Sequence, residues 1–362
     1  MRIPFPLGIG DAITVPRNEL FRGAYALNSS PLRFGILGAA RINGPAILSP
    51  VKEVPEVTIR AIAARDPHRA QAVAKKHQIP VVHTSYEALL ADPEIDAVYI
   101  PLPNSLHAEW ATKALQAGKH VLCEKPITAN ADEAESLARV AEKNGLIIAE
   151  AMHSRYHAIA DRVVALVRSG VIGDVKHVEA HACFVIPGSK DIRWQYEMGG
   201  GALMDLGVYA VAILRSLAGR EPTAVTSVEA KLAKPQVDRW VDARLAFDGG
   251  VTGRVLTSLW GWPMLAGIAW AEGTQGTLRV INPYGPQLFN RIEIVRGKEV
   301  TKEFVPRLPA TYVSQLRAFA ESVRTGVLPR TGPAHFIANM KVIDAIYRQA
   351  GLLPRGMTLP RG

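Results

Sequence analysis

One stretch decides the fold of this chain: Leu32-Arg33-Phe34-Gly35-Ile36-Leu37-Gly38-Ala39-Ala40-Arg41-Ile42-Asn43-Gly44. Residues 32–37 have the apolar pattern of a buried strand, and the small residues that follow predict a tight turn. Pro45 then favours the first turn of a helix, because its fixed φ suits that position. A strand, a glycine turn and a helix N-terminus together present backbone N–H groups to an anion. The stretch therefore predicts a phosphate-binding turn.

The glycine pattern of this turn is incomplete. Dinucleotide-binding turns carry G-x-G-x-x-G, and here only Gly38 matches, because the second and third glycine positions hold Ala40 and Asn43. The surroundings strengthen the prediction, since a second strand at 57–63 follows after one helix length and completes a βαβ unit.

The end of that second strand bears on the choice of cofactor. Arg65 and Asp66 stand there, where an acidic residue would hold the ribose hydroxyls of NAD and an arginine would pair with the 2′-phosphate of NADP. Arg65 favours NADP, and Asp66 keeps NAD open. A solvated turn residue is the structural alternative for Arg65.

The alternation of strand and helix patterns continues to residue 150. Strands are expected at 32–37, 57–63, 81–83, 97–100, 121–123 and 146–149, with helices at 66–76, 86–90, before Gly118 and at 130–144. Six strands separated by helices predict a doubly wound parallel sheet, so residues 31–150 are expected to form a Rossmann domain of the α/β class. Residues 1–30 show no periodicity and are interpreted as an irregular N-terminal arm.

The character of the chain changes after Glu150. Strands are expected at 176–186, 224–232, 241–247, 250–260, 276–282 and 291–295, and helices at 158–169, 202–218, 311–324 and 333–350. Turn residues such as 248–250 join neighbouring strands, which predicts a large, mostly antiparallel open sheet. Residues 151–362 are therefore expected to form an α+β domain.

Composition narrows the function classes. The chain has 362 residues, of which 48% are hydrophobic and 21% charged, enough for a large core in two domains. The net charge of +9 comes from lysines and arginines scattered among acids, so nucleic-acid binding is only a weak alternative. No apolar run reaches the roughly 20 residues that cross a membrane. Early prolines and charges argue against a secretory signal.

Cysteine and histidine spacing predicts neither a disulfide framework nor a metal site. Cys123 and Cys183 are the two cysteines, and their separation fits a reducing compartment, with the cytoplasm as the expected location. His153 and His157 stand four residues apart but lack an acidic or cysteine partner at a usual spacing. No G-x-S-x-G elbow supports a serine hydrolase.

A charged pair follows the apolar strand at 121–123. Glu124 and Lys125 come directly after it, and Pro126 forces the backbone to turn. Ligands bind at the carboxyl ends of the strands in an open parallel sheet, so Lys125 is placed to contact a substrate hydroxyl. A surface ion pair at a strand-to-loop junction is the alternative.

The second stretch that carries candidate catalytic residues is Gly199 to Tyr209. Residues 202–218 are apolar nearly all the way round in a helical arrangement, so this helix is expected to be buried. Asp205 is costly there unless it is paired, and Tyr209 lies four residues on, on the same helix face. The functional interpretation places Asp205, Tyr209 and the glycine run against a substrate. Local pairing of Asp205 and simple packing of Tyr209 are the alternative.

Together these motifs resemble the Gfo/Idh/MocA oxidoreductases, in particular the branch with dimeric dihydrodiol dehydrogenase, NADP-dependent D-xylose 1-dehydrogenase and glucose-fructose oxidoreductase. The resemblance covers roughly residues 31–350 and rests on segments 35–42, 63–66, 104–107, 124–126, 150–156 and 199–209. Each segment alone is modest evidence, whereas all of them in order are specific. Many relatives carry histidine where this chain has Tyr209, and tyrosine is typical of this branch.

The resemblance implies roles for the residues already singled out. The nicotinamide would lie near Lys125, and hydride would pass between its C4 atom and a carbinol carbon of a sugar or polyol. Tyr209 would be the acid–base group, with Lys125 lowering its ordinary pKa of about 10. Asp205 would orient Lys125 or a substrate hydroxyl, and Glu124 would support the lysine.

The resemblance also implies two sets of binding residues. Those expected at the cofactor are Gly38, Ala39, Ala40, Arg41, Ile42, Arg65, Pro101, Asn104, His107, Glu124 and Lys125. Those expected at the substrate pocket are Arg155, Arg193 and Trp194. For these three and for His107, a surface or packing role is equally open.

The expected function is an NADP(H)-dependent oxidoreductase acting on a sugar or cyclic diol, with oxidation of an aldose at C1 as the leading case. Two alternatives remain, namely a nicotinamide-dependent glycosidase that oxidises its substrate transiently and a non-catalytic sensor that binds NADP. The presence of Lys125, Asp205 and Tyr209 argues against the sensor. A homodimer or homotetramer is implied, with the open sheet of the substrate-binding and oligomerisation domain 151–362 pairing between subunits.

Overall fold

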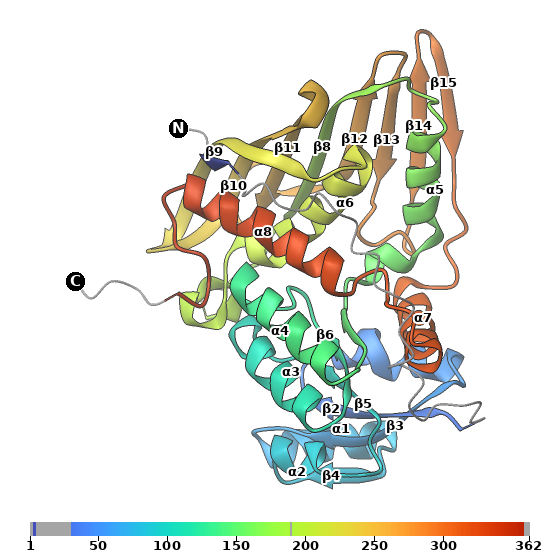
Figure 1. Ribbon diagram of the computed structural model, residues 1–362, viewed down its shortest axis with the longest axis vertical. Helices are drawn as coiled ribbons and strands as arrows, with labels where there is room; N and C mark the ends of the chain where they lie inside the picture. Colours follow the sequence, from blue (N-terminus) through green and yellow to red (C-terminus); the bar gives the residue numbers. More distant parts are fainter. Residues whose placement is uncertain (1–2, 5–29, 189, 358–362) are drawn as a thin grey trace.

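A computed structural model describes residues 3–4, 30–188 and 190–357 of the chain. Two β-sheets form its framework, one of six strands and one of nine (Figure 1). The predicted fold, a doubly wound parallel sheet followed by an α+β part with a large and mostly antiparallel sheet, is confirmed. Most of the predicted arm, residues 1–30, lies outside the described residues. Ile3–Pro4 (β1) pairs antiparallel with β9 (Pro222–Lys234), a strand of the larger sheet.

The six-stranded sheet is wholly parallel, with the spatial order β4-β3-β2-β5-β6-β7. In chain order, its strands are β2 (Leu32–Leu37), β3 (Val57–Ala63), β4 (Val81–His83), β5 (Ala97–Ile100), β6 (His120–Cys123) and β7 (Ile148–Glu150). The order reverses between β2 and β5, which is where the crevice for a dinucleotide opens in this type of sheet.

Four helices connect these strands, namely α1 (Pro67–His77), α2 (Tyr86–Leu90), α3 (His107–Gln116) and α4 (Ala131–Lys143). Asp66 is the predicted N-cap of α1, and its carboxylate accepts from the backbone of His68 and Arg69. The connection after β2 differs from expectation. A π-helix (Gly44–Leu48) and a 3₁₀ turn (Pro50–Glu53) replace a regular helix, because Pro50 cannot donate the hydrogen bond that would continue one.

The nine-stranded sheet has the order β1-β9-β10-β11-β8-β12-β13-β14-β15. Only β8 and β11 pair in parallel, and every other neighbouring pair is antiparallel. The strands are β8 (Val175–Phe184), β9 (Pro222–Lys234), β10 (Val237–Phe247), β11 (Thr252–Ser258), β12 (Leu265–Gly273), β13 (Thr277–Ile281), β14 (Arg291–Arg296) and β15 (Glu299–Glu303).

Sequence patterns missed two of these strands. β12 is rich in alanine and glycine, which have low strand propensity, and it forms because it pairs along its whole length with β8. β15 is a short, charged and exposed edge strand beside β14. In both cases long-range pairing stabilises a segment whose own sequence does not favour a strand.

The remaining helices are α5 (Ala158–Arg168), α6 (Val208–Ala218), α7 (Thr311–Thr325) and α8 (Pro333–Gln349). Helices α5, α6 and α8 lie against the nine-stranded sheet (Figure 1). Although α7 belongs to the second half of the sequence, it packs on the Rossmann sheet, where the rings of Phe319 and Phe34 are 5.6 Å apart. The chain therefore returns to the six-stranded sheet after forming the nine-stranded one.

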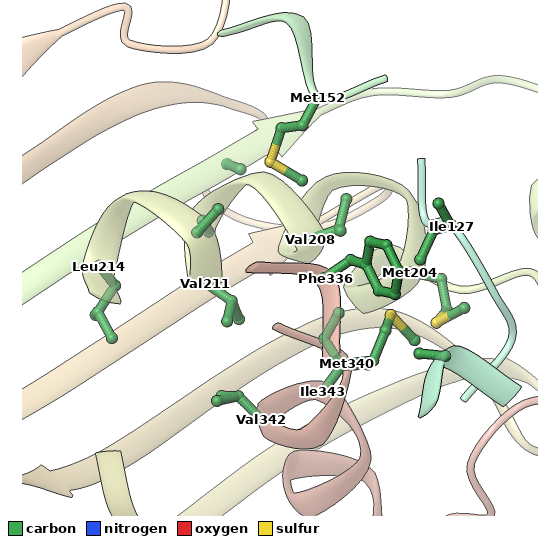
Figure 2. Packing of buried hydrophobic residues seen from close by; sticks show 14 of the residues in the cluster. Ile127, Met152, Met204, Val208, Val211, Leu214, Phe336, Met340, Val342 and Ile343 are labelled. Carbon is green, nitrogen blue, oxygen red and sulfur yellow. The ribbon is translucent and has the colours of Figure 1, made fainter. Parts of the chain in front are cut away.

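Helix α6 is the central helix of the second domain. Figure 2 shows Val208, Val211 and Leu214 of α6 among the side chains of α8, with Met152 and Ile127 beside them. The helical stretch Tyr196–Ala218 has the length and hydropathy of a membrane span, which the sequence analysis did not recognise, but 67% of its apolar window is buried. Its apolar character is that of a core helix.

Candidate active site

Lys125 and Asp205 meet at the carboxyl end of the parallel sheet. Lys125 follows β6 directly, and Asp205 lies in a short π-helix (Leu203–Gly207) that leads into α6. The Lys125 Nζ donates to the Asp205 Oδ1 at 2.9 Å and to the Asp205 backbone carbonyl at 2.8 Å. Single π-turns of this kind are frequent at functional sites.

Arg193 is the third member of this charged group. Its Nε donates to the Asp205 Oδ2 at 3.0 Å, and its guanidinium also contacts Asp191. Burial favours the neutral acid, but Lys125 and Arg193 outweigh it and hold the pKa of Asp205 below its ordinary value. Asp205 is therefore an anion that bridges two basic side chains.

The run of three glycines before the π-helix packs against the protein itself. Asn104, after β5, donates to the Gly199 carbonyl at 3.0 Å, and a Cβ at position 199 would lie 2.8 Å from the Asn104 Cβ. Gly201, at φ 130°, leaves no room for a Cβ beside Asp238 and Arg355. The predicted close approach of the backbone exists, but its partners are side chains and backbone atoms of this chain.

Tyr209 lies beside the charged group. The Lys125 Nζ is 5.0 Å from the centroid of the Tyr209 ring, and the rings of His153 and Tyr284 are 5.7 and 6.0 Å away. Burial raises the pKa of Tyr209 well above its ordinary value, and the nearby Tyr312 adds to this. The expected lowering of this pKa by Lys125 is not seen in this structure, where burial and the neighbouring Tyr312 and Glu124 all raise it. The neutral phenol is a proton donor.

Glu124 supports Lys125 in a different way from the one expected. Its carboxylate accepts from the Tyr99 hydroxyl at 2.6 Å and from the Lys125 backbone N–H at 3.3 Å. Burial raises the pKa of Glu124. These contacts fix the backbone at Lys125 and leave the amine of that residue to Asp205.

The predicted phosphate-binding turn lies at the end of the neighbouring strand. Gly38 has a φ of 123°, and its N–H donates to the Ala63 carbonyl at 2.8 Å. Arg69, in the first turn of α1, donates to the carbonyl of Ala39 at 2.7 Å. The turn is therefore tied to the end of β3, where Arg65 is exposed.

The other residues predicted at the cofactor lie within this turn or directly after β5. Ala40 and Ile42 are half-buried and Arg41 is exposed, while Pro101 is buried at the end of β5. All of them lie at the carboxyl ends of β2 and β5, on either side of the point where the strand order reverses.

Two residues predicted to contact the cofactor or the substrate, His107 and Trp194, instead contact other groups of the protein. His107 is fully buried, and its two ring nitrogens each lie 2.7 Å from a backbone carbonyl, those of Pro126 and Leu102. No ring nitrogen is left to contact a cofactor. Trp194 is buried in a small cluster with Tyr196 and Leu259, so it is a packing residue.

Arg155 lines a small cavity of about 30 Å³ together with Tyr209, Ser216 and Tyr284. Burial lowers the pKa of Arg155 to about 10. Its guanidinium donates to the Ser216 hydroxyl, and its Nε has no hydrogen-bond partner within the described part of the chain. A cavity of this size accommodates water and not a sugar, so the structure does not place Arg155 in a sugar pocket.

Sequence reasoning missed several neighbours of the charged group. His153, considered there only as a metal ligand, stacks at 4.1 Å on Tyr312 beside Tyr209. Glu150, fully buried at the end of β7, accepts from the backbone of Ile127 at 3.0 Å. A carboxylate at the end of a buried strand was a usable signal for Glu150, whereas the aromatic neighbours come from distant segments.

Two family models match the chain. One is the oxidoreductase family with an NAD-binding Rossmann fold (GFO/IDH/MocA), which matches residues 32–152, and the other is the GFO/IDH/MocA C-terminal domain, which matches residues 161–279. Together they cover the six-stranded sheet and strands β8 to β12 of the nine-stranded sheet.

Two curated relatives are similar over almost their whole length. D-xylose 1-dehydrogenase (NADP(+)) 2 of Haloferax volcanii is 38% identical over 88% of this chain and 97% of its own. A dTDP-3,4-didehydro-2,6-dideoxy-alpha-D-glucose 3-reductase of Actinomadura kijaniata is 31% identical over 88% and 96%.

Two solved structures superpose on most of this chain. A 3-ketoreductase from Actinomadura kijaniata, in complex with NADP and TDP-benzene, superposes with a TM-score of 0.81 at 29% identity, covering 88% of this chain and 98% of that one. An aldose-aldose oxidoreductase from Caulobacter crescentus, complexed with glycerol, has a TM-score of 0.81 at 26% identity, covering 89% and 98%.

Proposed function

This chain belongs to the Gfo/Idh/MocA family of oxidoreductases, and from that premise we propose that it is an NADP(H)-dependent dehydrogenase acting on a carbinol carbon of a sugar or cyclic diol. The family membership makes it an oxidoreductase. Its relatives include an NADP-dependent xylose dehydrogenase and a trans-dihydrodiol dehydrogenase, which supports this substrate class.

The observation that carries the proposal is the meeting of Lys125 with Asp205 and Tyr209. The lysine comes from the nucleotide-binding sheet and the other two from the second domain, and the contacts are 2.9 Å to the carboxylate and 5.0 Å to the phenol ring. A donor amine, its carboxylate anchor and a neutral phenol at the mouth of a dinucleotide crevice suit proton transfer to or from a reacting oxygen.

The residues at the crevice fit an NADP cofactor. A side chain at position 38 would have a Cβ 3.1 Å from Leu102, so glycine keeps this turn open where a pyrophosphate would approach. Arg41 in the turn and Arg65 after β3 are both exposed, so either can pair with a 2′-phosphate. NADP, when bound, accepts or supplies the hydride.

The residues of the chain would handle the proton and the orientation. In reduction, Tyr209 would donate its phenolic proton to the substrate carbonyl oxygen, and in oxidation it would take the hydroxyl proton back. Lys125 would stabilise the negative charge on the phenol oxygen or on the substrate. Asp205 would hold the amine of Lys125 within reach of both the phenol oxygen and the substrate.

Steady-state assays on a substrate panel test the proposal. Aldoses, cyclic diols and a dTDP-linked keto sugar are mixed in turn with NADP or NADPH, and absorbance of the reduced cofactor is followed. We expect net reduction of NADP when an aldose or a cyclic diol is the substrate. Glycoside cleavage without net cofactor change would favour the nicotinamide-dependent glycosidase, and absence of any reaction would favour the sensor.

We also propose a homodimer or homotetramer formed through the nine-stranded sheet, in a reducing compartment such as the cytoplasm. The face of the sheet away from α6 carries a charged group in which Glu179 contacts His177, His181 and Arg254. Both cysteines are free and buried. Light scattering coupled to gel filtration would test the assembly, and a monomer would contradict it.

A further inference from the structure

A single peptide group directly after Lys125 and Pro126 is held at both of its polar ends. The His107 Nδ1 lies 2.7 Å from the Pro126 carbonyl oxygen, and the Ile127 N–H donates to the Glu150 Oε1 at 3.0 Å. Both side chains are fully buried, at 0% exposure. The backbone next to Lys125 is therefore held by Glu150 at the end of β7 and by His107 at the start of α3.

His107 makes two hydrogen bonds that a neutral ring cannot satisfy. Its Nδ1 faces the Pro126 carbonyl and its Nε2 faces the Leu102 carbonyl, each at 2.7 Å. A carbonyl oxygen only accepts, and a neutral imidazole has a single N–H, so two such bonds require both nitrogens to carry hydrogen. The distance is also within the range of bonds made by charged donors.

The surroundings of His107 contain the charge that this state needs. Burial lowers the pKa of His107, while its two carbonyl acceptors and the Glu150 carboxylate act in the opposite direction and Lys125 acts with burial. The second oxygen of Glu150 has no hydrogen-bond partner among the described residues and lies 3.6 Å from His335 Nε2. Glu150 is the acidic side chain among the groups that act on His107.

We infer that a doubly protonated His107 and Glu150 form a clamp on the Pro126–Ile127 peptide that positions Lys125 for catalysis. Neither side chain reaches the reacting atoms, so both are positioning residues. The clamp also joins the Leu102 loop after β5 to the turn after β6, at the ends of two neighbouring strands. This inference depends on the proposed function only in the role of Lys125.

The protonation state of His107 is tested by ¹⁵N NMR of the full-length protein labelled at histidine. At about pH 7 we expect both ring nitrogens of His107 to appear as protonated. His107→Gln identifies the signal, and neutron diffraction from crystals of the deuterated wild type gives the same answer if that variant does not fold. An unprotonated ring nitrogen at about pH 7 would overturn the inference.

The positioning role is tested with Glu150→Gln, which retains an acceptor for Ile127 but removes the charge. We expect the second proton of His107 to be lost and kcat to fall roughly tenfold to a hundredfold, the effect of a small misplacement, with the Kd for NADP unchanged. The matched control is Glu133→Gln, because Glu133 also accepts from a backbone N–H, that of Ala129, away from Lys125.

The outcomes separate the clamp from the proposed function. Wild-type kcat in Glu150→Gln would overturn the positioning role, as would an equal loss in Glu133→Gln. If the wild type shows no dehydrogenase turnover with any substrate, the proposed function fails, and the NMR measurement still decides whether His107 is doubly protonated.

Discussion

The ε-amine of Lys125 lies 2.9 Å from the carboxylate of Asp205, across 80 positions of sequence and from one domain to the other. Both side chains are only 15% exposed. A pair with so little solvent contact is screened weakly by salt, so the attraction between the two charges persists at high ionic strength. The group that we propose as catalytic therefore exists only when the two domains are docked.

Lys125→Met should lower turnover by about two to four orders of magnitude, the usual contribution of a positioned proton-transfer group and its electrostatic support. The Kd for NADP should change little, because the amine is held by Asp205. Initial rates and fluorescence titration of NADPH measure the two quantities. Lys113→Met, an exposed lysine paired with Glu109, is the control. Unchanged turnover in the Lys125 variant would contradict the site.

Tyr209→Phe removes one oxygen and keeps the ring packed against His153 and Tyr284. We expect kcat to fall by about two to four orders of magnitude with little change in thermal stability, because only the proton-transfer group is lost. Tyr284→Phe alters a neighbouring phenol of the same cluster and should retain most activity. Equal losses in the two variants would point to packing instead of proton transfer.

The raised pKa of Tyr209 predicts different pH dependences for the two directions of reaction. Below this pKa the phenol holds its proton, so reduction should be nearly independent of pH between about pH 6 and about pH 8. Oxidation needs the deprotonated form, so its kcat/KM should rise with pH through the alkaline range. Profiles of both directions measure this. An oxidation rate that levels off near neutrality would show that bound ligands lower this pKa.

Arg65→Ala should raise the KM for NADP about tenfold to a hundredfold, since a hydrogen bond to a charged group contributes about 1.5–3 kcal/mol. The KM for NAD should change little, because NAD lacks the 2′-phosphate. Arg162→Ala, an exposed arginine paired with Glu303, is the control. Parallel increases for both cofactors would contradict the assignment of Arg65.

Asp238→Ala should destabilise the fold by about 3–5 kcal/mol, because it leaves the buried Arg355 guanidinium without its carboxylate. Asp238 accepts from Arg355 at 2.6 Å, from Tyr347 at 2.9 Å and from the Leu203 N–H at 2.8 Å, and its side chain is fully buried. Urea denaturation measures the change.

The exposed pair of Glu321 with Arg324 is the comparison for this stability test. Glu321→Ala should change the unfolding midpoint far less, because solvent already screens the pair. Equal shifts in Glu321→Ala and Asp238→Ala would mean that the Asp238 network adds nothing beyond an ordinary surface contact.

Much of the Rossmann half could be predicted from local pattern. The strand at 32–37, the cap at Asp66 and the helix after Asn130 are where periodicity and capping residues place them. β12 and β15 could not be predicted in this way, because their pairing with distant strands outweighs their own propensity. The helix at 311–324 (α7) could be predicted from its pattern, but its packing on the Rossmann sheet could not, because an apolar helix face does not specify which sheet it covers.

Short-range periodicity is enough to predict which chemical groups stand at the strand ends and which helix is buried, and the cost of burying a lone carboxylate predicts that Asp205 is paired. The partner of each group depends instead on the three-dimensional arrangement. It gave Asp205 two basic partners, enclosed His107 between two carbonyls and assigned Trp194 to the core. Contacts of this kind depend on how two domains dock, and no local pattern encodes that geometry.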